Sequence, residues 1–182
     1  MLDINSKIII DNKEYEIIKL LGKGKGGYSY LARFNNEFYV VKKIHHEPCS
    51  YYSFGNKIQS EYNDYHHLSN LGIRIPKMIY VDFEQEIIVK EYIDGDTIFD
   101  IVLKDQMKDE YYIQIKKMCE ILYRNSTNID YFPTNFVVQN EILYYIDYEC
   151  NKYMEEWNFE NWGIKYWYKT KELEEYINSK GE

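Results

Sequence analysis

Three strand-like apolar runs near the start of the chain constrain its fold most strongly. They are YEIIKLL, YSYLARF and FYVVKKI, between Tyr15 and Ile44. A glycine-rich stretch separates the first two runs, and Asn35-Asn36 separates the second from the third. Glycine and asparagine are both typical turn residues. The pattern therefore predicts consecutive strands of one small antiparallel sheet.

A helix and a hairpin are predicted after this sheet. Apolar residues at helical spacing, beginning with Ile58, predict an amphipathic helix from about Ser53 to Leu71 that ends near Gly72. The runs MIYVDF and EIIVKEYI predict a hairpin that turns across residues 84–86. We therefore expect the amino-terminal half to be a sheet with one helix.

The sequence of the second half of the chain predicts a mainly helical region that begins after Asp94-Gly95. A helix is expected from about Asp109 to Tyr123. Its expected buried stripe comprises Ile113, Ile115, Met118, Ile121 and Leu122. The segment NIDYFPTN reads as a loop, and FVVQNEILYYID as a short hairpin turning at residues 139–141. A charged helix is expected at the end of the chain.

The composition is that of a globular chain. The length of 182 residues favours a single domain, which can still have two lobes. A hydrophobic content of 45% with 21 Tyr is too high for an intrinsically disordered chain. The formal net charge of −8 argues against non-specific binding to nucleic-acid phosphates, which requires a basic surface. No stretch is long and apolar enough to span a bilayer, so we expect a cytoplasmic protein without membrane insertion.

The cysteines and histidines do not indicate a disulfide framework or a transition-metal site. Cys49, Cys119 and Cys150 are odd in number and widely spaced, so we expect reduced, mostly buried thiols. The four histidines form two adjacent pairs, at 45–46 and 66–67, without the helical i, i+4 spacing of a zinc site. We expect them to have surface or packing roles.

The glycine-rich stretch LGKGKGGYSYLA carries Gly22, Gly24 and Gly27 at G-x-G-x-x-G spacing. A Rossmann site has the same glycines but leads into a helix, whereas the residues after Gly27 continue as a strand. This context favours a hairpin whose backbone amides approach phosphates, because glycine leaves no side chain in the way. A flexible hairpin without a ligand explains the motif alone equally well.

Lys42 and Glu61 form a second candidate pair. Strand alternation in VVKKI places Val40 and Lys42 on one face and Lys43 on the other. Lys42 could then reach nucleotide phosphates, and Glu61 on the following helix offers it an ion-pair partner. Taken singly, each is more simply explained as a solvated surface residue.

The strongest chemical signal is Asp130-x-x-x-x-Asn135, followed after a short hairpin by Asp147. Phosphoryl transfer needs a carboxylate near the attacking hydroxyl and oxygen ligands for Mg²⁺, and these three residues provide both. Acids and asparagines also cap loops, which is the alternative explanation for this segment alone.

Taken in order, these motifs resemble the protein-kinase superfamily. The resemblance covers Tyr15 to Glu149 and is closest to small atypical members, such as aminoglycoside phosphotransferase-like, lipopolysaccharide-kinase-like and RIO-like proteins. It implies an α+β, two-lobed kinase-like fold formed by one domain, residues 1–182. The N-lobe, about 1–93, would be an antiparallel sheet plus one helix. The C-lobe, about 94–182, would be reduced and mainly helical.

The resemblance also assigns roles to residues that would bind the nucleotide. Three glycines would cover the phosphates: Gly22, Gly24 and Gly27. Lys42 would contact the α- and β-phosphates as a catalytic residue, and Glu61 would orient it. Backbone groups from Glu91 to Ile93, in the segment that resembles the hinge, would meet the adenine.

The remaining roles concern catalysis and the metal. Asp130 resembles the catalytic residue that accepts or orients the acceptor proton, and Asn135 and Asp147 resemble the Mg²⁺ ligands. The implied function is an ATP-dependent phosphotransferase that binds Mg²⁺-ATP between the lobes. Its acceptor, a serine or threonine of a protein or a small hydroxyl compound, is not identified by the sequence.

Three features depart from the family pattern. Asn128 occupies the position of the usual catalytic-loop histidine, and Asp147 is followed by Tyr148-Glu149 rather than Phe-Gly. Only 35 residues follow Asp147, too few for a full helical lobe. The reduced C-terminal part and the absent histidine keep open a nucleotide-binding pseudokinase or regulatory scaffold. A further alternative is an unrelated α+β module whose motif matches are accidental.

The tail WNFENWGIKYW contains Trp157, Trp162 and Trp167. We expect a helix that packs these indoles into the lobe, with an exposed aromatic surface as the alternative. A homodimer or a protein partner would cover any apolar surface left exposed there.

Overall fold

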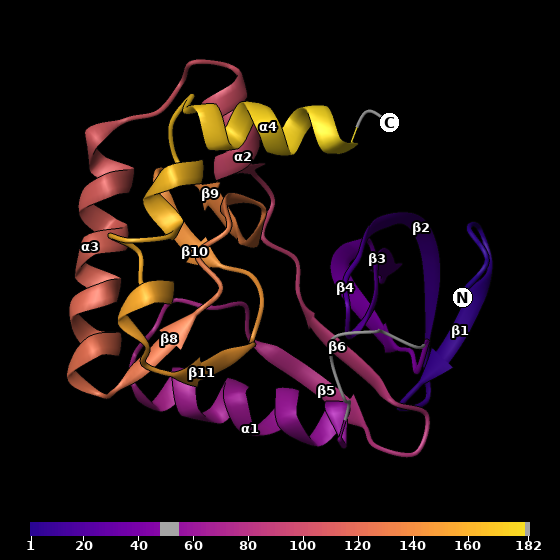
Figure 1. Cartoon of the computed structure of the whole chain (residues 1–182). Helices are drawn as coiled ribbons and strands as arrows, with labels where there is room; N and C mark the ends of the chain where they lie inside the picture. The colour runs from indigo at the N-terminus through magenta and orange to yellow at the C-terminus, as the bar shows by residue number, and fades with distance from the viewer. Residues whose placement is uncertain (48–54, 181–182) are drawn as a thin grey trace. The chain divides into compact units, whose positions relative to one another are not determined.

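The computed structural model describes residues 1–47 and 55–180 (Figure 1). The chain forms two compact units. Unit 1 comprises Met1–Tyr65 and Pro76–Tyr92, and unit 2 comprises His66–Ile75 and Ile93–Glu182. Helices and antiparallel strands are both present, which confirms the α+β class. No helix within the described ranges has the length and apolarity needed to cross a membrane.

Unit 1 is built on a curled six-stranded antiparallel sheet with the strand order β1-β2-β3-β4-β6-β5 (Figure 1). Its strands are β1 (Lys7–Ile10), β2 (Lys13–Lys23), β3 (Gly27–Phe34), β4 (Glu37–Ile44), β5 (Met78–Asp82) and β6 (Ile87–Glu91). The three strands predicted between Tyr15 and Ile44 are β2, β3 and β4. The edge strand β1 was not predicted, because its four residues offer little alternation to recognise.

Two tight turns join β1 to β2 and β3 to β4. Asp11 and Asn12 have φ angles of 50° and 57°, and Asn35 and Asn36 have φ angles of 47° and 63°. Two consecutive residues with positive φ are typical of type I′ turns, which match the twist of antiparallel strands. The predicted turn at Asn35-Asn36 is therefore confirmed, while the turn at Asp11-Asn12 was missed.

The core of unit 1 lies on one face of this sheet. Tyr28, Tyr30 and Ala32 alternate along β3 and are buried, as strand geometry requires for residues on one face. Val41 of β4 and Val89 of β6 belong to the same buried cluster. This packing fixes which face of β4 each of its side chains occupies.

Helix α1 (Lys57–Asn70) follows the sheet. Its start is capped by Asn56, whose Oδ1 accepts a hydrogen bond from the Gln59 N–H at 3.1 Å. The expected start at Ser53 lies outside the described residues. The helix ends where predicted, because Gly72 adopts a φ of 76° and lets the Ile73 N–H donate to the Leu68 carbonyl at 3.0 Å.

The hairpin of β5 and β6 also forms as predicted. Asp82 closes its turn by accepting hydrogen bonds from the backbone N–H groups of Glu84 and Gln85, at 3.0 and 2.8 Å. An aspartate that binds backbone donors two and three residues ahead is a common way to stabilise such a turn.

Unit 2 combines helices with short strands. Its helices are α2 (Ile98–Leu103), α3 (Asp109–Arg124) and α4 (Lys171–Lys180). Its strands are β7 (Asp96–Thr97), β8 (Thr127–Ile129), β9 (Phe136–Gln139), β10 (Ile142–Tyr145) and β11 (Cys150–Lys152). Helix α3 packs against β8 and β10 (Figure 1). The hairpin of β9 and β10 and the terminal helix α4 confirm two predictions.

The segment predicted as the loop NIDYFPTN is more ordered than expected. It begins inside β8, which pairs with β11, and ends in the 3₁₀ helix η1 (Pro133–Asn135). A three-residue strand is too short to be recognised from its own sequence, since its partner strand lies more than 20 residues away. Asp130 follows β8 directly.

The buried face of α3 differs in part from the predicted stripe. Ile113 and Ile121 are 50% and 38% exposed, so their predicted burial was wrong. The buried residues are Tyr111, Ile115, Met118, Cys119 and Leu122. These follow the helical period from Tyr111, which places Ile113 on the opposite side of the helix.

The tail does not form the predicted tryptophan helix. It contains the 3₁₀ helices η2 (Glu155–Trp157) and η3 (Gly163–Tyr166), joined by turns. Trp167 is fully buried and its indole N–H donates to the Tyr131 carbonyl at 2.8 Å. Trp162 is half-buried, while Trp157 is 50% exposed. The expected burial therefore holds for Trp167 without the expected helix, while Trp157 is exposed.

The thiols follow the expectation only in part. Cys119 is buried, whereas Cys150 is half-buried, and Cys49 lies outside the described residues. Burial raises the pKa of the Cys119 thiol to about 12. A neutral, enclosed thiol of this kind acts as a packing group.

Candidate functional site

The glycine-rich turn joins β2 to β3 in unit 1. An added Cβ at Gly22 would meet no heavy atom within 4 Å, and one at Gly24 would meet only the Gly27 carbonyl at 3.9 Å. Gly27 differs, because its Cβ would lie 2.7 Å from the backbone oxygen of Lys43. Gly27 is therefore required by the packing of β3 on β4, whereas packing does not require glycine at positions 22 and 24.

The turn is held by the segment that follows β4. The Gly24 N–H donates to the Gly27 carbonyl at 2.9 Å, and His45 Nε2 lies 3.0 Å from the Gly24 carbonyl. Glu47 forms an ion pair with Lys23 at 2.6 Å and accepts a hydrogen bond from the Tyr28 hydroxyl. The hydrogen bond from Lys23, and to a lesser extent that from Tyr28, lowers the pKa of Glu47 to about 2.

Lys42 and Glu61 form the ion pair expected from the sequence. Lys42 Nζ lies 2.6 Å from Glu61 Oε1, and the two side chains are only 11% and 12% exposed. Lys43 lies on the opposite face of β4, where its ammonium donates to the Gln85 carbonyl. The predicted alternation of the two lysines is therefore correct.

Glu61 also lies close to the glycine-rich turn. A Cβ at Gly26 would lie 3.4 Å from Glu61 Oε1, so the turn passes close to this carboxylate. Among the described residues, Glu61 Oε2 is buried and has no hydrogen-bond partner. Unit 1 thus brings together the turn, a buried cation and a carboxylate with one unused oxygen.

The residues predicted to meet adenine are Glu91 and Ile93. Glu91, the last residue of β6, is exposed; its N–H donates to the Lys77 carbonyl at 2.9 Å, and its carboxylate accepts from the Lys77 N–H at 3.1 Å. Ile93, the first residue of this part of unit 2, is buried. The Glu91 N–H is therefore already used within unit 1.

In unit 2, Asp130 and Asn135 belong to one hydrogen-bonded loop. Asp130 Oδ1 accepts from the Phe132 N–H at 3.0 Å. The Asn135 side-chain amide donates to the Asp130 carbonyl at 3.3 Å, and the Asn135 N–H donates to the Phe132 carbonyl at 2.9 Å. These bonds fix the Asp130 side chain and bring Asn135 back toward it.

Asp147 is joined to the same loop through the backbone. It follows β10, and the Ile146 N–H donates to the Asn135 carbonyl at 2.8 Å. Asp147 Oδ1 accepts from the Tyr148 N–H at 2.8 Å. The two predicted metal ligands therefore come from adjacent segments that are hydrogen-bonded to one another.

Tyr145 is a site residue that the sequence analysis missed. It is fully buried, and its hydroxyl donates to the Glu149 carbonyl at 2.7 Å. Burial, followed by the nearby carboxylates of Asp147 and Asp130, raises the pKa of Tyr145 well above 10.0. Tyr145 therefore lies near both the predicted catalytic Asp130 and the predicted metal ligand Asp147. Burial of alternate residues along β10 was the signal available in the sequence.

The donor set in unit 2 suits a hard cation that a nucleotide brings with it. Among the described residues, no group of three or more His, Cys, Asp and Glu side chains forms a metal site. Mg²⁺ in nucleotide sites uses one or two carboxylates, with substrate phosphates and water supplying the rest of its shell. Asp147 would supply one carboxylate to such an ion, and Asn135 would supply one amide oxygen.

Asn128, in the position of the expected histidine, has a structural role. It is 4% exposed in β8, and its amide donates to the Met154 carbonyl at 2.8 Å. Its Oδ1 is buried and finds no hydrogen-bond partner in the part of the chain that the structure describes. Asn128 therefore anchors the strand that leads into Asp130 to the tail.

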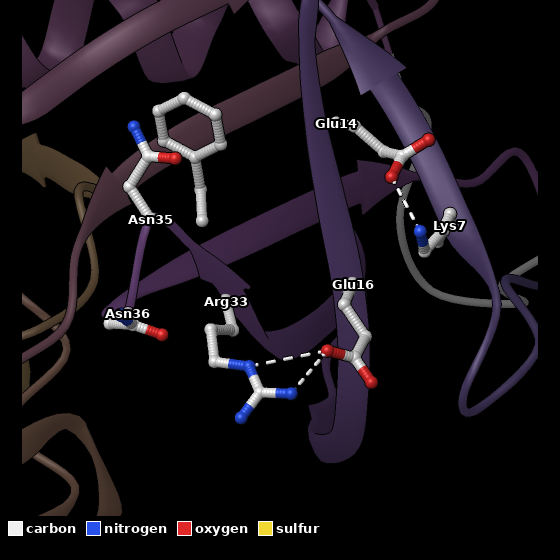
Figure 2. A pocket seen from close by; sticks show the side chains of 7 residues that line it. Lys7, Glu14, Glu16, Arg33, Asn35 and Asn36 are labelled. Atoms are coloured by element: carbon white, nitrogen blue, oxygen red, sulfur yellow. Dashed lines mark hydrogen bonds and ion pairs between the residues drawn. The ribbon is translucent and has the colours of Figure 1, made fainter.

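A polar pocket elsewhere on unit 1 contains none of the predicted site residues (Figure 2). It is lined by Lys7, Glu14, Glu16, Arg33, Phe34, Asn35 and Asn36. Lys7 pairs with Glu14 at 2.6 Å and Arg33 with Glu16 at 2.5 Å, as Figure 2 shows. Cross-strand ion pairs of this kind stabilise a sheet, which accounts for the charges in this pocket.

Neither a scan against protein-family models nor a search of the curated proteins finds a match to the chain. The functional assignment therefore depends on the residues and their geometry.

Proposed function

We propose that the chain is an ATP-dependent phosphotransferase that uses Mg²⁺-ATP. In this proposal the fold is a small two-lobed protein-kinase-like fold, with unit 1 as the N-lobe and unit 2 as a reduced C-lobe. The glycine-rich turn and Lys42 bind the phosphates of the nucleotide, while Asn135 and Asp147 bind its metal ion.

The buried ion pair of Lys42 and Glu61 carries the proposal. Removing two charges from water is costly, and a buried pair is often no more stable than apolar residues of similar volume. A pair with side chains only 11% and 12% exposed therefore favours a role beyond stability. Lys42 lies in the strand next to an open glycine turn, where a fixed ammonium can neutralise phosphate charge.

The loop of unit 2 supports the chemical step. Asp130, fixed by the Phe132 N–H, would orient an acceptor hydroxyl and take up its proton. Bound Mg²⁺ would neutralise charge on the phosphates. The acceptor class is a serine or threonine of a protein, or a small molecule with a hydroxyl group.

A nucleotide-binding pseudokinase is the second candidate, and Asn128 is the observation that favours it. The Asn128 amide donates its hydrogen bond to the Met154 carbonyl, so it cannot support the catalytic loop as an imidazole does. In this alternative the nucleotide would bind and would not be turned over.

Calorimetric titration tests the nucleotide site. A non-hydrolysable ATP analogue is titrated into the full chain with and without Mg²⁺, and into Asp147→Asn. We expect Mg²⁺ to tighten binding to the wild type, and Asp147→Asn to remove most of that gain while leaving metal-free binding unchanged.

Asp105→Asn is the matched control, because Asp105 is exposed and pairs with Lys169 on the surface. This variant should bind as the wild type does. The absence of nucleotide binding, or an equal loss with and without Mg²⁺ in Asp147→Asn, would contradict the proposed site.

A further inference from the structure

Lys57, at the start of α1, is a buried cation without an assigned role. It is 7% exposed. Its ammonium donates to the Lys25 carbonyl at 3.1 Å and to the His45 carbonyl at 2.5 Å. Burying an ammonium is unfavourable unless acceptors compensate it, and these two carbonyls provide that compensation.

The two carbonyls come from two segments that meet at the glycine-rich turn. Lys25 lies within the turn, and His45 follows β4 and contacts the Gly24 carbonyl through its own ring. Lys57 therefore joins the turn, the end of β4 and α1. It does so through backbone atoms, which makes the link independent of the side chain at position 25.

Lys57 and Glu61 lie one helical turn apart on α1 and so share a face. Through Glu61 this face contacts Lys42, and through Lys57 it contacts the turn. The same face of α1 thus positions both groups that would bind the phosphates.

We propose that Lys57 is a positioning residue for phosphate binding, which holds the glycine-rich turn in register with the Lys42–Glu61 pair. This inference rests on the proposed function of the same site. A turn rich in glycine loses much conformational entropy when it is ordered. Ordering it before the nucleotide binds removes that cost from the binding step.

The proposal makes a prediction that general destabilisation does not. Loss of Lys57 should weaken ligands that carry phosphates and spare adenosine, which has none. In Lys57→Met we expect the dissociation constant of the Mg²⁺-ATP analogue to rise at least fivefold, and that of adenosine to change less than twofold. Lys57→Arg, which keeps the charge and the donors, should restore most of the ATP affinity.

Hydrogen exchange on the nucleotide-free protein tests the link independently of any nucleotide. In Lys57→Met, amides of residues 22–28 should exchange at least tenfold faster than in the wild type. Those of the β5–β6 hairpin should be unchanged. Lys117→Met, which removes an exposed lysine on α3, is the charge-matched control and should alter neither region.

The outcomes separate the two proposals. Unchanged exchange at residues 22–28 refutes the link itself. Faster exchange with unaltered ATP affinity, or an equal loss for ATP and adenosine, refutes the positioning role. If the wild type binds no nucleotide, the proposed function fails and the positioning role fails with it, whatever the exchange shows. If Lys57→Met does not fold, Lys57→Gln takes its place in both experiments.

Discussion

Removal of Glu61 should destabilise the protein far more than removal of a surface carboxylate. Glu61→Leu leaves Lys42 without its carboxylate at a site where the lysine side chain is 11% exposed. Breaking a fully buried pair costs about 3–5 kcal/mol. Since about a tenth of each side chain reaches solvent, we expect a loss near the lower limit, about 3 kcal/mol of unfolding free energy.

Thermal unfolding followed by circular dichroism measures this loss. For a chain of 150–250 residues, each kcal/mol lowers Tm by about 2–4 °C, so Glu61→Leu should melt about 6–12 °C below the wild type. The matched control is the exposed pair of Lys104 and Asp96, which has a similar length of 2.8 Å with side chains 50% and 52% exposed. Lys104→Met should cost less than about 1 kcal/mol.

The double variant Lys42→Met/Glu61→Leu separates stability from function. Replacing both charges with apolar groups should recover most of the lost stability, because no unpaired charge remains. The double variant should not bind nucleotide, because it lacks the Lys42 ammonium that would bind the phosphates. The reasoning is refuted if Glu61→Leu costs no more than Lys104→Met, or if the double variant is as unstable as the two single losses added together.

Three further perturbations test the packing around the site. Gly27→Ala, whose Cβ would lie 2.7 Å from a backbone oxygen, should lower the free energy of unfolding in urea by about 1–3 kcal/mol. Gly22→Ala, with open space around it, should change this free energy by less than about 0.5 kcal/mol. Equal losses in the two variants would contradict the close packing at Gly27. Trp167→Phe should lose about 1–3 kcal/mol because a buried carbonyl loses its donor, whereas Trp157→Phe should be neutral. Iodide should quench the exposed Trp157 and spare the buried Trp167. Burial raises the pKa of Cys119 to about 12, so this thiol should resist iodoacetamide at pH 8 until the protein unfolds. Its contribution to the free energy of unfolding should disappear as pH rises from about 9 to about 12. Labelling of the Cys119 thiol in the native protein at pH 8 would contradict its burial.

Local signals explain what the sequence predicted well. Alternation along FYVVKKI placed Lys42 and Lys43 on opposite faces, because strand geometry allows little else. Asn35-Asn36 was recognised as a turn because asparagine tolerates positive φ. Similar local signals predicted the C-terminal end of α1 and the hairpin of β9 and β10.

Contacts between segments far apart in the sequence were not predictable. The role of Lys57 depends on backbone carbonyls 32 and 12 residues away. Because every residue has a backbone carbonyl, the sequence does not indicate which ones Lys57 contacts. Strand β8 forms only because it pairs with β11. Ile113 and Ile121 were misplaced for a related reason: several overlapping apolar stripes run along α3, and packing selects among them.

Transfer of the labelled γ-phosphate of Mg²⁺-ATP, measured on the full chain and on added hydroxyl acceptors, tests the central claim most directly. We predict stoichiometric incorporation by the wild type. Asp130→Ala should bind the nucleotide normally and transfer about 10²–10⁴ times more slowly. Nucleotide binding without transfer by the wild type, or equal rates for the two proteins, would contradict the proposed phosphotransferase.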